Sequence, residues 1–413
     1  MKLLVISQYY YPEPFRITDI CQSLVKLGHE VDVLTSVPNV PQGRFYEGYG
    51  WFKRGEKIHE GVNIERVGVF QRRKGSTLHL ILNCASFAVN SLFHLPGLRK
   101  NSYDAVFVFN NSPITKILPA KRIARIKKIP NVVFLLDIWP QSLFFLTGIK
   151  EGERRTFFQK LAYRLCVWLY NSVDMMLISS PGFAEKLREM GVHCKTRYFP
   201  NYAEEFPEGD FTVTRAELDL KEDDFVVCFA GNIGKAQGLE QTVEATFLCN
   251  KDNLRWLIVG NGPELERLKE QVKEQKLEDH YRFTGWVNGS EVYAYLSVAD
   301  ALFVPLMDQE VLNLTVPAKL QTYMYAGKPV ITYMNGAGAE VVREARCGFT
   351  AEAGSITALA GAIDRMYDSS SDELLKMGEN GRNYCKEYYD KDMLIHRLVE
   401  YLTEAIEDYP AEH

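Results

Sequence analysis

Two series of apolar, β-rich runs, each interleaved with amphipathic stretches, constrain this chain more than any other feature of its sequence. The first series consists of KLLVIS, EVDVLTS, VNIERVGVF, DAVFVF, NVVFLLD and DMMLISS. The second consists of FVVCFAGN, LRWLIVGNG, ALFVPLM, KPVITYM and CGFTAEA. Short strands that alternate with helices are typical of βαβ units and parallel sheets. The sequence therefore predicts an α/β protein with two doubly wound, Rossmann-like domains.

The length of 413 residues is too great for one ordinary domain and agrees with the two series of runs. The polar segment 201–224 separates the series and is interpreted as a linker, and residues 371–408 are interpreted as a helical tail. We place the two domains at 1–203 and 204–385, followed by a C-terminal helix at 386–413. Ligands of doubly wound domains bind at the carboxyl ends of the strands, so we expect a ligand cleft between the two sheets.

The net charge of −5 conceals two halves of opposite sign. Residues 1–205 contain 28 Lys and Arg against 17 Asp and Glu, whereas residues 206–413 contain 20 against 36. A basic domain suggests nucleic acid or an anionic membrane surface as its partner, unless the imbalance only reflects solvated faces. Because no nucleic-acid-binding motif accompanies the charge, we favour a membrane and expect no nucleic acid.

The eight cysteines are scattered singly along the chain, and no two of them have metal-binding or redox spacing. We also find no cleavable signal segment at the start of the sequence. Both observations predict reduced, buried thiols in a cytoplasmic protein.

Segment 78–96 is apolar enough to suggest contact with a membrane, but it contains two histidines and two asparagines. Basic residues flank it on both sides, so a helix that lies in the membrane interface and a buried core helix are both plausible. Two further segments, 121–128 and 154–170, combine basic and aromatic residues, including Arg154 and Arg155. Each basic side chain near anionic lipid contributes about 1 kcal/mol, so these segments favour reversible docking of the protein on a membrane.

Three turns in the second half contain glycine or proline between a strand and a helix, and the first and third of them also contain a lysine. Such turns point backbone N–H groups at an anion, and three of them at one sheet edge suggest a nucleotide diphosphate, although each alone could be an ordinary loop. The candidate residues are Gly231, Asn232, Gly234, Lys235, Gln237 and Gly238 in the first turn, Gly260, Asn261 and Gly262 in the second, and Thr315, Val316, Pro317 and Lys319 in the third.

The first strand is followed by YYYPEPFRITDI, a turn that contains no glycine where a phosphate-binding loop usually has several. Its prolines predict a rigid loop, and Arg16 offers bidentate contacts to a phosphate. In the alternative interpretation, Arg16 pairs with Glu13 or Asp19 and only fixes the following helix.

These motifs together resemble the retaining GT-B glycosyltransferases of family 4, in particular the bacterial O-antigen, capsule and exopolysaccharide branch that includes N-acetylfucosaminyl transferase-like proteins. The resemblance spans nearly the whole chain and is carried by YYPEPFRITDI, LGHEVDVLTSVPNVPQGRFYEGY, LLDIWPQS, SSPGFAEKL, AGNIGKAQGLE, VGNGPE, FTGWV and VPAKLQTYMYAGKPVI. It implies a nucleotide-sugar donor, expected to be UDP-linked, on the second domain. It implies a polyprenyl-pyrophosphate-linked saccharide as the acceptor on the first domain, and a final helix that crosses back to that domain. No metal or other cofactor is implied.

The resemblance also assigns candidate residues. Glu13, Arg16 and Asn39 are expected on the acceptor side, and the turn at Trp286 and Val287 resembles the nucleobase contact.

The sequence departs from the family at the catalytic positions. Leu314 and Thr322 stand where family 4 commonly has two glutamates, which leaves Glu310 as the nearest acid upstream. Asn232 and Gln237 stand where it has an Arg–Lys pair, so Lys235 is expected to replace that pair, with Lys319 as an alternative. Asp137 stands where a histidine is common, and it either contacts substrate or caps the next helix.

Two other functions fit parts of the sequence. A nucleotide-sugar epimerase can have a similar two-domain shape, but it would need no lipid-linked acceptor and no basic first domain. A non-catalytic, transferase-like subunit that docks on a membrane partner is suggested by the missing glutamate pair.

Overall fold

The computed structural model describes residues 1–73, 77–98, 100–148, 156–204 and 212–410. The chain divides into two compact units. The N-terminal unit contains Met1–Pro200 and Asp392–His413, and the C-terminal unit contains Asn201–Lys391. The boundaries therefore lie a few residues from the expected positions. The segment interpreted as a linker belongs to the C-terminal unit, because Leu220 is buried in its core and Arg215 pairs with Asp300 at 3.0 Å.

The N-terminal unit is built on an eight-stranded sheet with the order β3-β4-β2-β1-β5-β6-β7-β8. Neighbouring strands are parallel except for the short antiparallel pair β3–β4. The strands are β1 Lys2–Ile6, β2 Glu30–Ser36, β3 Ile58–His59, β4 Val62–Val67, β5 Ala105–Asn110, β6 Asn131–Leu135, β7 Met175–Ile178 and β8 Lys195–Tyr198. The central strands are buried along their whole length, which is the pattern expected for a parallel sheet covered on both faces.

Right-handed crossovers place the helices that follow β4, β5, β6 and β7 on one face of this sheet and the helix that follows β1 on the other. The helices are α1 Ile17–Lys26, α2 Thr77–Leu98, η1 Ile114–Lys116, α3 Ile117–Lys127, α4 Gln141–Thr147, α5 Phe157–Tyr170, α6 Gly182–Glu189 and α15 Lys391–Glu407. Helix α2 packs against α3, and the Lys121 ammonium of α3 lies 3.5 Å from the ring centroid of Trp168 on α5. The three helices α2, α3 and α5 are therefore neighbours.

Helix α2 has one side packed into the unit and one exposed apolar side. One side is anchored in the unit, where Asn83 accepts a hydrogen bond from Gln8 Nε2 at 2.6 Å and Asn90 Nδ2 donates to the Gly68 carbonyl at 2.6 Å. Its length and composition would allow a membrane crossing, yet 33% of the window Leu78–Leu95 is buried in the protein. The other side exposes an apolar stripe of Leu78, Ile81, Val89, Leu92 and Phe93.

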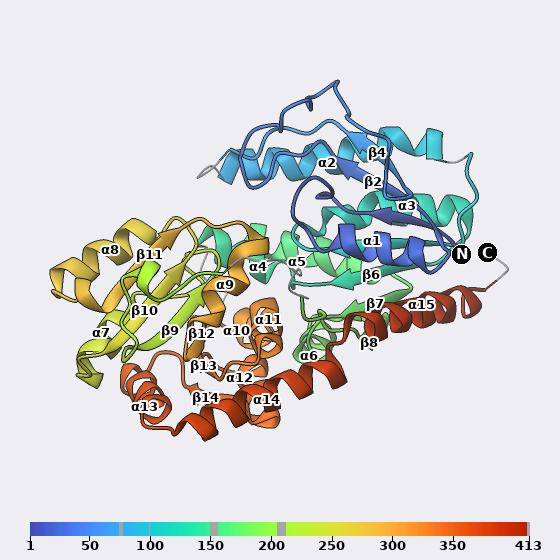
Figure 1. Ribbon diagram of the computed structural model, residues 1–413. Coiled ribbons are helices and arrows are strands. Elements are labelled where there is room, and N and C mark those ends of the chain that lie inside the picture. The colour runs from blue at the N-terminus through green and yellow to red at the C-terminus, as the bar shows by residue number, and fades with distance from the viewer. Residues whose placement is uncertain (74–76, 99, 149–155, 205–211, 411–413) are drawn as a thin grey trace. The chain divides into compact units, whose positions relative to one another are not determined.

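Helix α15, coloured red in Figure 1, belongs to the N-terminal unit from Asp392 onwards. It is held to the edge strand β8 by ion pairs in which Glu404 accepts from Lys195 at 2.5 Å and from Arg197 at 3.1 Å. The crossing point lies at residue 391 rather than at the expected 386, because α14 extends to Tyr388 and the Tyr389 carbonyl accepts a bond from Ala203 N–H within the C-terminal unit.

The C-terminal unit has a six-stranded parallel sheet with the order β11-β10-β9-β12-β13-β14. Its strands are β9 Phe225–Ala230, β10 Leu254–Val259, β11 Tyr281–Gly285, β12 Ala301–Pro305, β13 Val330–Tyr333 and β14 Gly348–Ala351. Its helices are η2 Ala216–Leu218, α7 Gln241–Cys249, α8 Leu265–Glu274, η3 Glu278–His280, η4 Gly289–Glu291, α9 Val292–Ser297, α10 Glu310–Asn313, α11 Ala318–Ala326, α12 Ala337–Ala345, α13 Ile356–Tyr367 and α14 Ser371–Tyr388. Separate apolar cores cover the two faces of the sheet.

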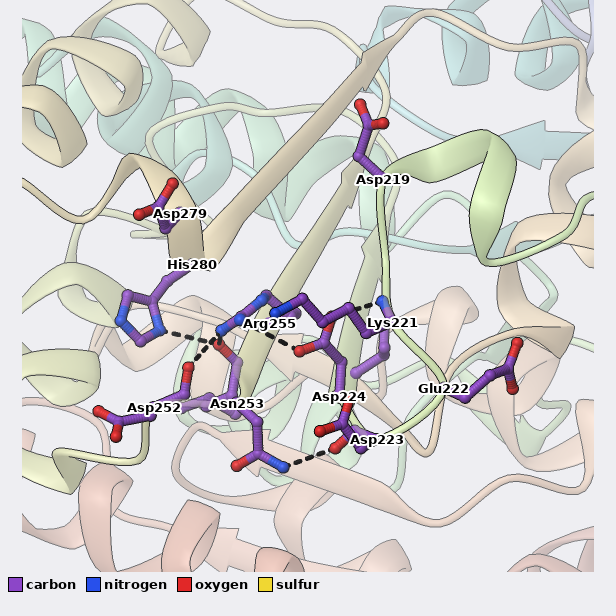
Figure 2. Close-up of polar contacts among 12 residues, drawn as sticks. Asp219, Lys221, Glu222, Asp223, Asp224, Asp252, Asn253, Arg255, Asp279 and His280 are labelled. Atoms are coloured by element: carbon purple, nitrogen blue, oxygen red, sulfur yellow. Dashed lines mark hydrogen bonds and ion pairs between the residues drawn. The ribbon is translucent and has the colours of Figure 1, made fainter.

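Polar contacts close the amino ends of β9 and β10, as Figure 2 shows. Arg255 pairs with the buried Asp224 at 3.1 Å and donates to the Asp252 carbonyl at 2.7 Å. Asn253 Nδ2 donates to the Asp223 carbonyl at 2.6 Å. These acidic residues are thus engaged in structural contacts at this end of the sheet, and the glycine-containing turns lie at the opposite, carboxyl end.

Candidate functional site

Three turns at the carboxyl ends of β9, β10 and β11 are joined through their backbones. Gly231 N–H donates to the Val259 carbonyl at 2.9 Å, and Gly260 N–H donates to the Gly285 carbonyl at 2.8 Å. The third glycine, Gly285, has a φ of +73°, which a residue with a side chain rarely adopts. Two of the turns predicted to bind an anion, those after β9 and β10, are therefore joined with the turn at Gly285 in one continuous backbone surface.

Close backbone approach explains two of these glycines. A Cβ on Gly260 would lie 2.0 Å from the Gly231 carbonyl oxygen, and a Cβ on Gly262 would lie 2.1 Å from the Ile233 carbonyl oxygen. No side chain fits at either distance. The loops after β9 and β10 can meet only because both positions lack a side chain.

The substitution Gly260→Ala is expected to lower the free energy of unfolding by about 2–4 kcal/mol, because it combines a backbone clash with an unfavourable φ of +129°. Thermal unfolding and UDP titration of the same sample would measure the effect, and UDP affinity should fall as the loops separate. Gly289→Ala is the matched control, since a Cβ there meets nothing within 4 Å. Equal melting temperatures for the two variants would contradict the close approach.

Lys319, in the first turn of α11, lies against this surface. Its Nζ lies 3.1 Å from the position that a Cβ would take at Gly231, and 4.0 Å from the ring centroid of Phe229. Within the described part of the chain it has no hydrogen bond and no ion pair, and burial lowers its pKa to about 7. Pro317 stands at the N-cap of α11, which has no side-chain cap. A cation at the positive end of a helix is unfavourable until an anion joins it, so this corner suits a phosphate.

Lys235, the residue expected at the diphosphate, stays a candidate beside Lys319, which the sequence offered as the alternative. Lys235 is exposed and makes no hydrogen bond or ion pair with any other described residue. Its neighbours Asn232 and Gln237 instead shape the loop, because Gln237 Oε1 accepts from Gly234 N–H at 3.1 Å and Asn232 Nδ2 lies beside the same glycine. Sequence reasoning preferred Lys235 because it is adjacent to the glycines along the chain.

The other expected donor residues lie around the same end of the sheet. Trp286 directly follows Gly285 and is 72% exposed, whereas Val287 packs against the core. Asn261 accepts a bond from Gly262 N–H through its own side chain at 2.7 Å. The exposed Trp286 is thus available to a ligand, and Asn261 holds its turn.

The loop that leads into α11 contains the remaining donor candidates. Val316 is buried, and Thr315 Oγ1 donates to the Val311 carbonyl at 3.0 Å. Glu310 is the first residue of the short helix α10 and is exposed. Thr322 lies one turn into α11 and donates to the Ala318 carbonyl at 3.3 Å.

Asp137 in the N-terminal unit follows β6 and is surrounded by donors. Its Oδ2 accepts hydrogen bonds from the Ser112 hydroxyl and from Trp139 Nε1, the latter at 3.2 Å. Its Oδ1 is buried and has no hydrogen-bond partner among the described residues. Pro140 stands at the N-cap of α4, so Asp137 does not cap this helix. Burial raises the pKa of Asp137, and a carboxyl group of raised pKa is suited to exchanging protons near neutral pH.

Sequence reasoning missed Lys116, whose charge interacts with that of Asp137. It is fully buried and donates to the side-chain oxygen of Asn111 at 2.6 Å. Burial lowers the pKa of Lys116 to about 7, and the charge of Asp137 opposes this shift. A lysine seven residues after the apolar run AVFVF, in FNNSPITK, was the available signal, although the letters alone do not distinguish it from a surface residue.

Two of the three expected acceptor residues have structural roles. Glu13 is 2% exposed, and its Oε1 accepts from the N–H groups of Asn39 and Val40, both at 2.7 Å. Burial raises the pKa of Glu13 to about 7. Asn39 is itself buried and accepts from Arg72 N–H at 3.0 Å. The burial of both side chains corrects the expectation that they meet an acceptor directly, and only Arg16, which is partly exposed at the start of α1, stays a candidate.

No group of three or more His, Cys, Asp or Glu side chains is arranged to hold a metal ion within the described residues. The eight cysteines are free, and Cys194 is the one among them that is partly exposed. Lys319, Trp286 and the backbone of the three turns thus form the candidate ligand-binding surface of the C-terminal unit, and Asp137 with its partners forms a second polar cluster in the N-terminal unit.

Two family models match the chain, one on each unit. The model described as "Glycosyl transferase 4-like domain" matches residues 15–202, and the model described as "Glycosyl transferases group 1" matches residues 210–384. Among curated proteins, the chain is 28% identical over 351 residues to the putative colanic acid biosynthesis glycosyl transferase WcaI of Escherichia coli. This match covers 80% of this chain and 83% of that protein.

Solved structures show the same fold. A sucrose-phosphate synthase from Thermosynechococcus elongatus matches with a TM-score of 0.75 at 18% identity, and covers 98% of this chain and 99% of the other. HepE from Anabaena, solved in complex with UDP, matches with a TM-score of 0.71 at 15% identity, and covers 98% and 100%. Because the two family models together span both units of this fold, the chain belongs to the GT-B glycosyltransferases of the group 1, family 4-like type.

Proposed function

We propose that the protein transfers a sugar, with retention of configuration, from a UDP-sugar to a saccharide carried on polyprenyl pyrophosphate, in the synthesis of a bacterial surface polysaccharide. The observation that carries the proposal is the ammonium of Lys319, which lies beside the backbone of Gly231 at the start of α11 and has no ion pair or hydrogen bond among the described residues. The likeness to a colanic acid glycosyl transferase supports the pathway, and the UDP bound to HepE supports the nucleotide.

The proposed chemistry requires a stabilised leaving group and a proton acceptor. The bond from the anomeric carbon to the diphosphate oxygen breaks, and the acceptor hydroxyl oxygen bonds to the same face of that carbon. Lys319 and the N–H groups at the start of α11 stabilise the charge that develops on the departing diphosphate. The proton of the acceptor hydroxyl passes to Asp137 or to the departing phosphate oxygen. We propose that this chemistry needs no bound metal.

Calorimetric titration with UDP, GDP and dTDP in the absence of metal tests the donor site. We expect UDP to bind and the other two to bind more weakly. Binding of none of them would overturn the donor proposal. UDP binding without turnover of any UDP-sugar would favour a non-catalytic subunit, which is the function suggested by Leu314 and Thr322 at the usual glutamate positions.

UDP binding is expected to take up a proton above pH 7. Burial lowers the pKa of Lys319 to about 7 in the free protein, so most of these side chains are neutral at about pH 8. A bound diphosphate favours the charged form, so affinity should fall as the pH rises, by at most about tenfold per pH unit. Calorimetry in buffers of different ionisation enthalpy would count the proton, and Lys319→Met should show no uptake. Uptake by that variant as well would assign the proton to another group.

We further propose that the protein docks reversibly on the inner face of the cell membrane, where a lipid-linked acceptor would be reached. The exposed stripe of α2 supports this, together with the exposed basic residues Arg122 and Arg125 of the neighbouring α3 and Lys128 at its C-cap. Arg154 and Arg155, also expected to contribute, lie outside the described residues.

A further inference from the structure

The side chain of Tyr323, on α11, ends against the last residue of β9. It is 1% exposed, and its hydroxyl accepts a hydrogen bond from Ala230 N–H at 2.6 Å and donates one to the Ala230 carbonyl at 3.0 Å. Burial raises the pKa of Tyr323, so the hydroxyl keeps the proton that it donates. One side chain of α11 thus bonds both polar backbone groups of the residue that directly precedes Gly231.

This hydroxyl completes the hydrogen bonding of β9 where the sheet opens. Strand β9 pairs with β12 at Val227 and Cys228, whereas its pairing with β10 continues to Ala230. Gly231 N–H donates to β10, and the N–H groups of successive residues in a strand point to opposite sides. The N–H of Ala230 therefore points towards the side of β12, and the Tyr323 hydroxyl takes the place that a longer β12 would fill.

The same side of α11 carries Lys319. It lies four residues before Tyr323, and side chains at this spacing are neighbours on a helix. Lys319 Nζ lies 3.1 Å from the position that a Cβ would take at Gly231, and 4.0 Å from the ring centroid of Phe229. These two side chains of α11 therefore contact three consecutive residues at the end of β9. A shift of α11 along or away from β9 would move the ammonium from the turn.

We propose that Tyr323 is a positioning residue for the donor diphosphate: its hydroxyl fixes α11 to the end of β9 and so holds the Lys319 ammonium beside Gly231. The inference rests on the proposed function and names a residue that acts on the donor site without touching the ligand. A contact group held by such a buried support loses less freedom when it binds its ligand.

Replacing Tyr323 with phenylalanine removes the hydroxyl and keeps the ring in the core. We expect a folded variant with a lower melting temperature, because the buried backbone groups of Ala230 lose their partner. Calorimetry should show that it binds UDP about 3- to 10-fold more weakly, since a displaced contact group binds less well.

The matched control is Tyr281→Phe, at the start of β11 and so at the opposite end of the sheet. Tyr281 is 4% exposed, and its hydroxyl forms hydrogen bonds with the hydroxyls of Thr242 at 2.9 Å and Thr246 at 3.3 Å. This variant also loses a buried hydroxyl with two partners, but its UDP affinity should stay within about twofold of that of the unchanged protein. An equal loss of affinity in the two tyrosine variants would overturn the proposal.

The protonation of Lys319 gives a readout that a purely structural role of Tyr323 would not change. Burial lowers the pKa of Lys319 to about 7, so the unchanged protein should take up nearly one proton when it binds UDP at about pH 8. If α11 moves away from β9 in Tyr323→Phe, the ammonium becomes solvated and its pKa rises, so the uptake should fall to about half or less. Weakened UDP binding with undiminished uptake would overturn the positioning role.

A double variant tests whether Tyr323 acts through Lys319. Side chains that act through one another have non-additive effects on binding. In a Lys319→Met background, Tyr323→Phe should therefore change the UDP dissociation constant by less than about twofold. If the two single effects multiply, Tyr323 acts on another part of the site and the inference fails.

These titrations also separate the inference from the proposed function. No UDP binding by the unchanged protein, or an unaltered affinity in Lys319→Met, would overturn the donor site and this inference with it. Normal binding by the unchanged protein and a defect in Lys319→Met, together with full affinity in Tyr323→Phe, would overturn the role of Tyr323 alone.

Discussion

Replacing Lys319 with methionine is expected to weaken UDP binding by about 10- to 100-fold, because a hydrogen bond to a charged phosphate contributes about 1.5–3 kcal/mol. The loss in kcat/KM should be larger, about 100- to 1,000-fold, since the negative charge on the leaving diphosphate grows in the transition state. The structure places this ammonium beside Gly231 with no carboxylate partner within the described residues. Calorimetry and initial-rate measurements on the same preparation would give both values.

The control is Lys235→Met, which removes the same charge from an exposed position on the neighbouring loop. We expect at most a few-fold change for this variant, because exposed charges are screened by water and salt. Lys319→Met should also keep or raise the melting temperature, because a partly buried ammonium without a partner is costly. A large defect in Lys235→Met and none in Lys319→Met would reverse the assignment of the two lysines.

The second large effect is expected for Asp137→Asn. A group that accepts a proton in the transition state contributes about 100- to 10,000-fold to the rate, so kcat should fall within that range. The affinity for UDP should not change, because Asp137 lies in the N-terminal unit and the donor site lies in the C-terminal one. The control for the loss of a charge in the same unit is Asp104→Asn. The carboxylate of Asp104 accepts a hydrogen bond from Lys2 N–H at 2.7 Å.

Lys116 provides a second readout on this site that a purely structural role would not alter. The positive charge of Lys116 lowers the pKa of Asp137, against the upward effect of burial. Removal of that charge in Lys116→Met should therefore raise the pKa of Asp137 and move the acidic limb of the pH–rate profile to higher pH. An unchanged profile, in a variant that folds normally, would show that Asp137 does not titrate in the reaction.

Both doubly wound units could be predicted from the sequence because buried parallel strands have nearly continuous apolar sequences. VVF in β6 and VVCF in β9 are examples, and both strands lie where they were expected. The edge strand β8, with the sequence KTRY, was not expected. It is partly exposed and polar, and only its pairing with β7 and its ion pairs with α15 make it a strand.

The sequence by itself determined the two parallel sheets, the order of strands and helices along the chain, and the glycines at the strand ends. Hydrophobic periodicity and the conformational freedom of glycine are local properties that can be read from neighbouring residues. Only the tertiary structure decided which side chains are buried and which lie against the glycine-containing turns. Lys235 is close to the glycines along the chain but exposed, whereas Lys319, more than 80 residues beyond them, lies beside Gly231. Glu13 looked accessible in its polar turn, but its carboxylate is buried against the N–H groups of Asn39 and Val40. The direction and burial of a side chain depend on what packs against it, and that is set by segments distant in the sequence.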